Sequence, residues 1–461
     1  MNRWNLDQLK ARLQQRKEVK GWIISQEHTH RRERYFLGES KNLAIDQDRD
    51  VRSESITARI FVKLPTVGRQ GEISKKLFLR LPLDPQLDVA IQSALQTDHQ
   101  AWELPIKLEA AVPQLSTTDP RMAEDLESVV QKLTQRISLA VNKARETTFN
   151  SAELFLSTHD RELHLSNGLV HRTSQSRIYL ETAYSYARKS ETSPIADSDE
   201  YLKTMWSVSL DDLPVEEFFD EASDRARHSL DVLRPVSGKF AVIVDSDVLL
   251  NLFHGQINQL SAVNAYNQLP FVKPGDALIP EAQGDLLTIS LDPSLSFGAD
   301  TLAISDQGVL QEPLLLVKEN QVVSTATEKQ YADYLKKEVT TSRGNILVAP
   351  GKLSHKELTE QAPAVLEVLQ FSGLFSDSNT GTFSSEIRLA KLYDNKKKTV
   401  TYIKGGSLSG SIRENFKNLR LSNQLVKRAH FENSEAMGGS NSGTGYHGPQ
   451  YALLSDVSIV S

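Results

Sequence analysis

The sequence contains no cysteine among its 461 residues. This absence excludes disulfide bonds, thiolate nucleophiles, cysteine-ligated zinc and iron–sulfur clusters. Any metal would have to be held by histidine and carboxylate side chains. Glycine and proline are also scarce, at 23 and 17 residues, while 39% of the residues are hydrophobic. This balance is typical of a folded protein and excludes global disorder.

A strong excess of charge and long apolar runs are missing as well. Lysine and arginine total 53 against 59 acidic residues, so the net charge is −6. We therefore expect no direct binding to nucleic acid or to an acidic membrane. No uninterrupted apolar stretch is long enough to span a bilayer, and residues 1–20 lack the apolar core of a signal peptide. These features predict a cytoplasmic protein.

The first half of the sequence predicts helices combined with an antiparallel sheet. Residues 21–81 are rich in β-branched and aromatic residues between turn residues, which indicates three or four strands. Strands return over residues 152–187, around a hairpin turn at Asn167-Gly168. A polar loop is expected over residues 188–200, and a helix over residues 214–233.

The strongest pattern is an apolar stripe at helical spacing. It predicts one long buried helix from about Pro120 to Arg145, with Asp119 as its N-cap. The stripe consists of Met122, Leu126, Val129, Val130, Leu133, Ile137, Ala140, Val141 and Ala144.

A domain boundary is predicted at Pro235-Val-Ser-Gly238, because the proline ring disfavours helix in the residue before it. A strand, a helix over residues 245–265 and then mostly strands follow. At the usual domain size, the length corresponds to two to four domains. We expect an α+β protein with an N-terminal domain of mixed helices and antiparallel sheet at residues 1–235, and a β-rich C-terminal domain at residues 236–461.

Three short motifs suggest chemistry that their surroundings do not support. His28 and His30 share one face of a predicted strand, but the arginines that follow would repel a cation. Residues 46–50 imitate the start of a calcium loop without its glycine or its bidentate glutamate, so we expect a polar turn. Residues 443–448 match Gly-x-Gly-x-x-Gly outside the strand–turn–helix that a dinucleotide needs. The glycine-rich run of residues 438–448 favours close passage of the backbone past a neighbour, which is either another strand or a bound peptide.

The helix predicted over residues 245–265 carries an unusual number of side-chain amides. The helix carries His254 together with the amides Asn251, Gln256, Asn258, Gln259 and Asn264. Two interpretations remain open. The amides are the solvated side of the helix, or they line a groove that holds an extended peptide backbone, which needs both donors and acceptors.

After this helix, several segments follow in a fixed order, namely Leu286–Pro293, Asp306–Val309, Lys318–Val322, Asn345–Gly351, Gly373–Ser376, Gly381–Ser384 and Asp456–Ile459. In the helix and these segments, the sequence resembles the TldD/PmbA family, and within it the TldE (PmbA) branch. The first half matches that family only in its layout of a helix and hairpins.

The resemblance implies a specific loss of catalytic residues. TldD-type subunits are zinc metallopeptidases with His-Glu-x-x-x-His on this helix and a cysteine near the C-terminus, and TldE-type subunits lack these groups. Here the window reads His254-Gly255-Gln256-Ile257-Asn258-Gln259. Glycine cannot act as the general base and an amide is a poor zinc ligand. We therefore expect no catalytic residues, no metal and no cofactor.

The function that follows is a non-catalytic TldE/PmbA-like subunit of a two-component TldD/TldE-type zinc metallopeptidase. It would contribute peptide binding and assembly to proteolysis. Its partners would be a TldD-type subunit, a second copy of itself, or both, together with an unfolded or extended peptide. The alternatives are a peptidase in its own right with a rebuilt site, and an interaction protein like the DNA gyrase modulators of this family.

Four residues are the candidates for the substrate groove: His254, Asn258, Gln259 and His447. In the resembling peptidases, the corresponding helix and C-terminal segment bring their ligands to one metal. We therefore expect the helix and the glycine run of residues 438–448 to face one polar pocket.

Overall fold

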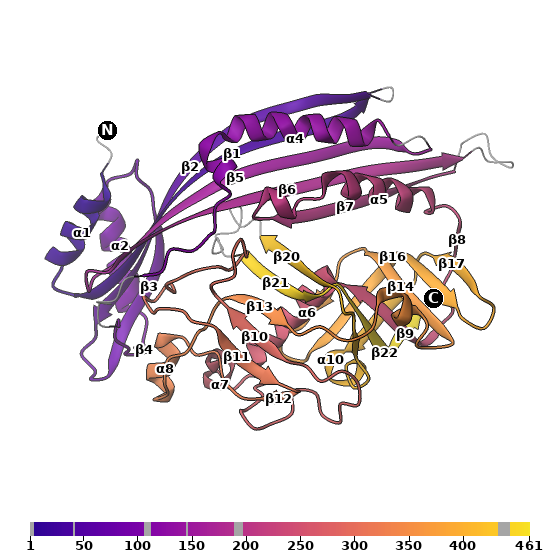
Figure 1. Cartoon of the computed structure of the whole chain (residues 1–461). Helices are drawn as coiled ribbons and strands as arrows, with labels where there is room; N and C mark the ends of the chain where they lie inside the picture. Colours follow the sequence, from indigo (N-terminus) through magenta and orange to yellow (C-terminus); the bar gives the residue numbers. More distant parts are fainter. Residues whose placement is uncertain (1–3, 40–41, 106–111, 144–145, 189–196, 432–442) are drawn as a thin grey trace.

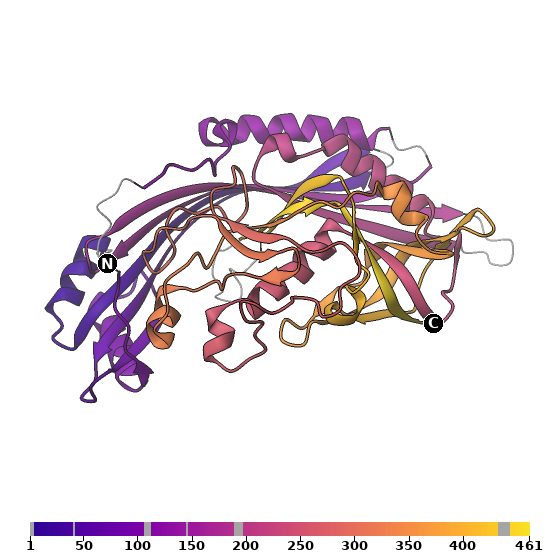
Figure 2. The ribbon, with the colours of Figure 1, turned by 60° about the horizontal axis from the view of Figure 1, so that its bottom comes forward.

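The structure is a computed structural model, and it describes residues 4–39, 42–105, 112–143, 146–188, 197–431 and 443–461 (Figure 1). The N-terminal half forms a long curved sheet that arches over the C-terminal half (Figures 1 and 2). The two chain ends lie at opposite ends of the molecule in both views. No helix among the described residues is long and apolar enough to cross a membrane. Helices and sheets combine into an α+β fold, as predicted.

The arch is one seven-stranded antiparallel sheet in which β1 and β2 run for 21 and 22 residues. Its hairpin turn between β5 and β6 contains Gly168 at φ 91°, which confirms the Asn-Gly turn. The strand order is β4 (His99–Gln100), β3 (Arg69–Leu77), β2 (Asn42–Lys63), β1 (Val19–Glu39), β5 (Thr148–Leu165), β6 (Val170–Arg188) and β7 (Asp197–Ser207).

Helices cover one face of this sheet, because alternate strand residues on that face are apolar. Helices α1 (Leu6–Gln15) and α2 (Leu83–Leu95) share a core with β1, β2 and β3. Helices α3 (Pro120–Glu124), α4 (Leu126–Val141) and α5 (Val215–Arg227) share a second core with β5 and β6. Figure 2 shows α4 along the outer side of the arch.

The predicted long helix is two helices, because the backbone leaves the helical region at Asp125, with φ −152° and ψ 88°. The Asp125 side chain then caps α4 by accepting the backbone N–H of Ser128 at 3.0 Å. Asp119 caps α3 as predicted, with Pro120 as the first helical residue. The apolar stripe is confirmed from Met122 to Val141, since these residues are buried, and Ala144 lies outside the described residues.

The C-terminal half contains two sheets with helix α6 (Ser246–Gln259) packed between them. The six-stranded sheet has the order β12 (Gln321–Val322), β11 (Leu314–Lys318), β10 (Ile289–Asp292), β13 (Asn345–Val348), β21 (Gly443–Pro449) and β20 (Leu425–Phe431). Seven strands of the nine-stranded sheet have the order β14 (Ala364–Phe371), β9 (Gly238–Asp245), β22 (Tyr451–Val460), β18 (Ser407–Ser411), β16 (Thr382–Asp394), β17 (Thr399–Ile403) and β8 (Val232–Leu233). In addition, β15 (Phe375–Ser376) pairs with β16, and β19 (Arg420–Leu421) pairs with β22.

Among the described residues, four short helices lie in the C-terminal half, and one 3-10 turn lies between β7 and α5. They are η1 (Leu210–Asp212), α7 (Ala262–Tyr266), α8 (Lys329–Leu335), α9 (His355–Thr359) and α10 (Ile412–Asn415). The helix predicted over residues 245–265 is therefore divided into α6 and α7. Helix α6 ends at Gln259, and Ser261 caps α7 by accepting the backbone N–H of Asn264.

Three further predictions are wrong in detail. Helix α5 ends at Arg227, and Val232–Leu233 already pairs in parallel with β17. The chain thus enters the second sheet just before the predicted boundary at residue 235, which itself stays a prediction. Residues 46–50 lie inside β2 and form no turn. Strand β7 begins at Asp197, within the predicted loop, and residues 189–196 lie outside the described residues.

The inner face of the arch meets the C-terminal half through apolar and ionic contacts. Ile23 and Leu163 pack with Ile304 from the C-terminal half. Arg161 of β5 donates to Asp306 at 2.7 Å, and Arg343 lies 3.4 Å from the same carboxylate. Burial alone would raise the pKa of Asp306, but these two arginines hold that pKa at about 2.

Candidate functional site

The helix that carries the peptidase motif in the resembling family is α6. Asp245 begins it by accepting the backbone N–H groups of Asp247 and Val248 at 3.1 and 3.2 Å. Burial raises the pKa of Asp245 to about 6, and the nearby charge of Asp247 adds to this rise. The apolar side of the helix, including Leu249 and Phe253, lies in the core between the two sheets. The side chains of Asn251, Asn258 and Gln259 lie on the outward side, whereas Gln256 is buried.

A turn of residues 376–381 packs against this outward side, and we call it the capping turn. It joins β15 to β16 and contacts α6 at three positions spaced one helical turn apart. Ser376 donates its hydroxyl to Asn251 at 2.6 Å. A Cβ at Gly255 would stand 3.6 Å from Cα and Cβ of Ser378. Gln259 donates its amide to the carbonyl oxygens of Ser378 at 2.7 Å and Asn379 at 3.2 Å.

The capping turn is also stabilised internally. The Asp377 carboxylate accepts the backbone N–H of Asn379 at 2.8 Å and the hydroxyl of Thr380 at 2.9 Å. These hydrogen bonds lower the pKa of Asp377. Gly381 has φ 69°, a conformation that glycine adopts without strain, and its N–H donates to the Asp377 carbonyl at 2.8 Å. The turn thus reaches the helix as a preformed unit.

The structure separates the four predicted groove residues. His254 and Asn258 lie exposed at one edge of α6, beside the capping turn. Gln259 is half-buried and bonded to that turn. His447 is in β21, and its neighbour Tyr446 points to α6, where its ring stacks on Phe253 with centroids 6.3 Å apart. Because successive strand residues point to opposite faces, His447 points away from α6.

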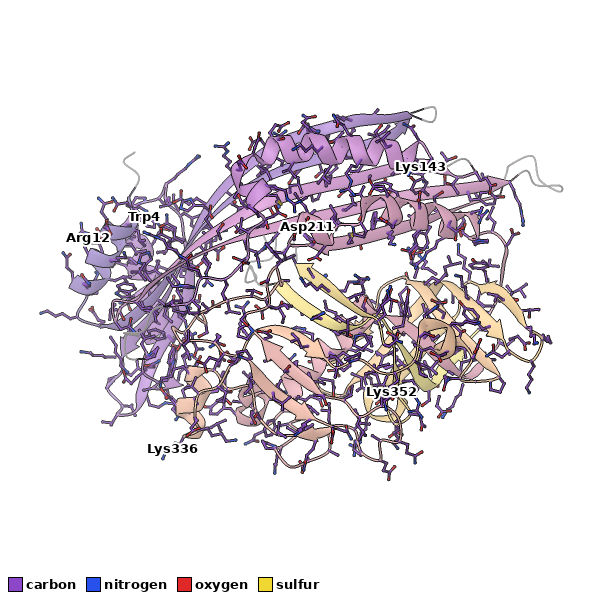
Figure 3. The ribbon with its side chains drawn as sticks, viewed as in Figure 1. Trp4, Arg12, Lys143, Asp211, Lys336 and Lys352 are labelled. Carbon is purple, nitrogen blue, oxygen red and sulfur yellow. The ribbon has the colours of Figure 1, made fainter. Side chains whose placement is uncertain are left out.

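The cross-strand neighbours agree with this orientation. In the register of β20 and β21, Arg428 lies opposite Tyr446 and Lys427 lies opposite His447. Arg428 reaches Asp247 of α6 at 3.3 Å, whereas Lys427 reaches Asp212 of η1 at 3.6 Å. In Figure 3 the label of the adjacent Asp211 marks where η1 lies.

The expected single pocket for His254 and His447 is therefore not formed by the described residues. Burial lowers the pKa of His447, and the nearby charge of Lys427 lowers it further. His447 is thus a neutral imidazole near neutral pH, on the face of the six-stranded sheet opposite α6.

The described part of the glycine run serves packing. A Cβ at Gly445 would stand 1.9 Å from Oδ1 of Asn345, and one at Gly443 would stand 2.7 Å from the carbonyl of Ala299. Asn345 is fully buried and donates to the Asp292 carbonyl at 3.0 Å and to Thr301 at 2.9 Å. This confirms the close passage of backbone past another segment for residues 443–448. Residues 438–442 lie outside the described residues.

Within the described ranges, no three histidine, aspartate or glutamate side chains come together as metal ligands. His30 pairs with Asp50 at 2.9 Å, and His28 contacts the amide of Gln26 at 3.1 Å. Both histidines lie on the sheet face, as the sequence predicts.

A depression of about 680 Å³ lies on the other side of the capping turn, on the outer face of the nine-stranded sheet. Phe375, 75% exposed, stands at its rim. Its floor includes one row of side chains across four adjacent strands, Ser384, Ser409, Ser458 and Lys239. Sequence reasoning missed this surface and the capping turn. The alternating serines of residues 407–411 are the one local sequence signal of the depression. No local sequence signal indicates the contact of the capping turn with α6.

The comparisons with known proteins address the C-terminal half most directly. The model of the PmbA/TldA metallopeptidase C-terminal domain matches residues 237–459. This C-terminal half belongs to the TldD/PmbA family. No curated protein matches it at a significant level of sequence similarity. The family assignment therefore rests on this domain.

Solved structures extend the likeness in fold to the whole chain. TldE from Thermococcus kodakarensis has a TM-score of 0.75 and 14% identity, over 99% of both chains. A protein described as a modulator of a DNA gyrase, from Thermotoga maritima, has a TM-score of 0.74 and 16% identity, over 99% of both chains. A second protein described as a modulator of DNA gyrase, from Bacteroides thetaiotaomicron, has a TM-score of 0.70 and 16% identity, over 98% of this chain and 97% of the other. At these identities the likeness concerns the fold.

Proposed function

We propose that this TldD/PmbA-family chain is a non-catalytic TldE-type subunit of a two-component zinc metallopeptidase. It binds unfolded or extended peptide and assembles with a TldD-type subunit that supplies the zinc and the general base. A second copy of this chain is the other partner that the assembly could contain.

The observation that carries this proposal is the contact between α6 and the capping turn. The two positions that hold the glutamate and the second histidine in the resembling peptidases are Gly255 and Gln259 here. Gly255 leaves the space into which Ser378 packs, and Gln259 donates both its N–H groups to the turn. The residues that would bind and activate a zinc-bound water are thus replaced by residues that hold a protein segment.

The fold supports assembly as the remaining role. A chain without bond-breaking groups acts on proteolysis only by adding surface to another subunit. The printed name of the Thermococcus kodakarensis structure is TldE, and that protein shares the fold over almost the whole length of both chains. Peptide binding then falls to surfaces other than the covered side of α6.

Reconstitution tests the proposal. This chain, purified without chelator, is mixed with a TldD-type chain that carries His-Glu-x-x-x-His, and association is followed by sedimentation at micromolar concentration. We expect a stable complex that hydrolyses an unfolded peptide, with zinc bound only to the TldD-type chain. Replacing the motif glutamate of that chain by glutamine should abolish hydrolysis.

His254→Ala separates this proposal from a rebuilt peptidase. The variant should leave the zinc content of this chain unchanged and keep hydrolysis by the complex. A tightly bound metal in this chain alone, with peptide hydrolysis that His254→Ala removes, would refute the non-catalytic role. Failure to associate with the TldD-type chain would refute the two-component role.

A further inference from the structure

The inner face of the arch carries a compact group of two carboxylates and two aromatic rings, which we call the inner tile. It consists of Glu153 and Phe155 of β5 and Glu181 and Tyr179 of β6. The strand register places Glu153 directly opposite Glu181 and Phe155 directly opposite Tyr179. All four point to the face away from α4, since Leu154 and Leu180 between them are buried in the core with that helix.

The two rings of the inner tile belong to a longer row of aromatic contacts. Tyr35 of β1 lies 5.3 Å from Phe155, and Phe155 lies 5.4 Å from Tyr179, measured between ring centroids. Tyr179 lies 4.7 Å from Trp206 of β7, and Trp206 lies 5.4 Å from Phe431 of β20. The row thus crosses four strands of the arch and ends on the C-terminal half.

Both ends of this row already hold a cation of the chain itself. The guanidinium of Arg49 lies over the ring of Tyr35 at 5.1 Å, and that of Arg177 lies over the ring of Phe431 at 4.4 Å. No described lysine or arginine lies over the three central rings. Aromatic faces attract cations. The centre of the row is therefore a surface that can bind a cation, and the arginines at its two ends show that such rings bind guanidinium groups in this protein.

The carboxylates of the inner tile add negative charge at this centre. Glu181 accepts the hydroxyl of Tyr179 at 2.6 Å. Among the described residues, no lysine, arginine or histidine forms an ion pair with Glu153 or Glu181. Burial raises the pKa of Glu153, and the charges of Glu181 and Glu33 raise it further. Like charges placed directly opposite on neighbouring strands destabilise a sheet.

The neighbouring carboxylate shows the contrast. Glu33, directly opposite Phe155 on β1, is bound by Arg31 at 2.6 Å and by Arg49 at 3.6 Å. The arch therefore neutralises one acidic residue of this face with two arginines and leaves the two of the inner tile without a cation. All four tile residues keep part of their surface accessible, and Thr204, next in the row after Glu181, is exposed.

We propose that the inner tile binds the guanidinium or ammonium group of an arginine or lysine side chain in an extended peptide. The cation lies over the rings of Phe155 and Tyr179 and pairs with Glu153 and Glu181, which relieves their repulsion. Basic peptides are then the substrate class that this subunit holds. The peptide part of the proposal rests on the proposed function, whereas the cation site stands on the geometry of the inner tile.

The test measures binding to the isolated chain, so that it does not depend on a partner subunit. The probes are blocked pentapeptides with arginine or glutamine at the centre of four glycines, and arginine amide. Calorimetry gives affinity, and the fluorescence of Trp206 next to the tile gives location. We expect the arginine peptide to bind, and the Glu153→Gln/Glu181→Gln variant to bind it at least about 10-fold more weakly.

Two controls are built into the chain. Glu217→Gln removes one charge from an exposed position on α5 and should leave the affinity unchanged. Trp206→Phe keeps an aromatic ring at this position and should lose the change in fluorescence, which assigns that change to Trp206. The double glutamine variant should melt at or above the wild-type temperature, because it loses a like-charge pair, so a loss of binding would not reflect unfolding.

Equal affinity for the glutamine peptide, or unchanged affinity of the double variant, would overturn the cation site. An equal loss in Glu217→Gln would show attraction to net charge and overturn it as well. Arginine amide binding as tightly as the peptide would overturn the assignment to a peptide. If this chain binds the arginine peptide but forms no complex with a TldD-type chain, the proposed two-component function is refuted and the cation site at the inner tile is supported.

Discussion

Replacing Gln259 by leucine tests whether α6 holds the capping turn. The two side chains have similar volumes, so the main change is the loss of two hydrogen bonds to the Ser378 and Asn379 carbonyls, at 2.7 and 3.2 Å. Each such bond contributes about 0.5–1.5 kcal/mol net. The freed carbonyls can bind water because the turn is at the surface. We therefore expect a loss of about 1 kcal/mol, at the lower end of the summed range.

The effect should be local, which hydrogen exchange can resolve. The backbone N–H of Gly381 donates to Asp377 at 2.8 Å, and that of Asp377 donates to Thr382 at 2.9 Å. If Gln259→Leu releases the turn by about 1 kcal/mol, exchange at these two amides should accelerate about 5-fold. Amides in the core of α6 should exchange as in the wild type.

Asn258→Leu is the matched control, because Asn258 is an exposed amide one residue earlier on the same helix. It should leave exchange in the capping turn unchanged. Unaltered exchange at Asp377 and Gly381 in Gln259→Leu, or equal acceleration in Asn258→Leu, would refute the role of Gln259 as a latch. The amides of α6 would then be an ordinary solvated surface.

Three more predictions follow from the structure. Leu133→Ala, at a side chain only 3% exposed in α4, should cost about 2–5 kcal/mol in urea unfolding, whereas Leu139→Ala, at 66% exposure on the same helix, should cost under about 0.5 kcal/mol. Gly255→Ala should stabilise α6 by up to about 1 kcal/mol, while Gly255→Glu should displace Ser378 and accelerate exchange in the capping turn. Burial would raise the pKa of Asp119, but hydrogen bonds from Arg121 and the backbone hold it at about 2. This pKa is below the unfolded value of about 3.9. The Asp119 carboxylate therefore contributes stability above about pH 5, and this stability is lost as the pH falls towards 2. The stability difference between wild type and Asp119→Asn should accordingly shrink by about 2 kcal/mol between pH 7 and pH 2, and a constant difference would contradict the assigned pKa.

Features that depend on neighbours in sequence were determined by the sequence alone. The stripe through Leu126, Leu133 and Ile137 predicts a buried helix because its spacing repeats with the helical turn. Asp119 before Pro120 marks a helix start, and Asn167-Gly168 marks a hairpin turn, since each acts through its own backbone. The absence of cysteine and the residues at the two motif positions, Gly255 and Gln259, are likewise known from the sequence before any coordinates.

Only the tertiary structure decided what lies against these elements. The capping turn reaches Gln259 across about 120 residues of sequence, and no local pattern records that contact. His447 and Tyr446 are adjacent in sequence, yet the register of β20 and β21 sends one away from α6 and the other onto Phe253. The inner tile exists because pairing of β5 with β6 places two glutamates opposite each other. Strand register and loop docking depend on the free energy of the whole fold, so the sequence by itself did not show which of its polar residues would meet.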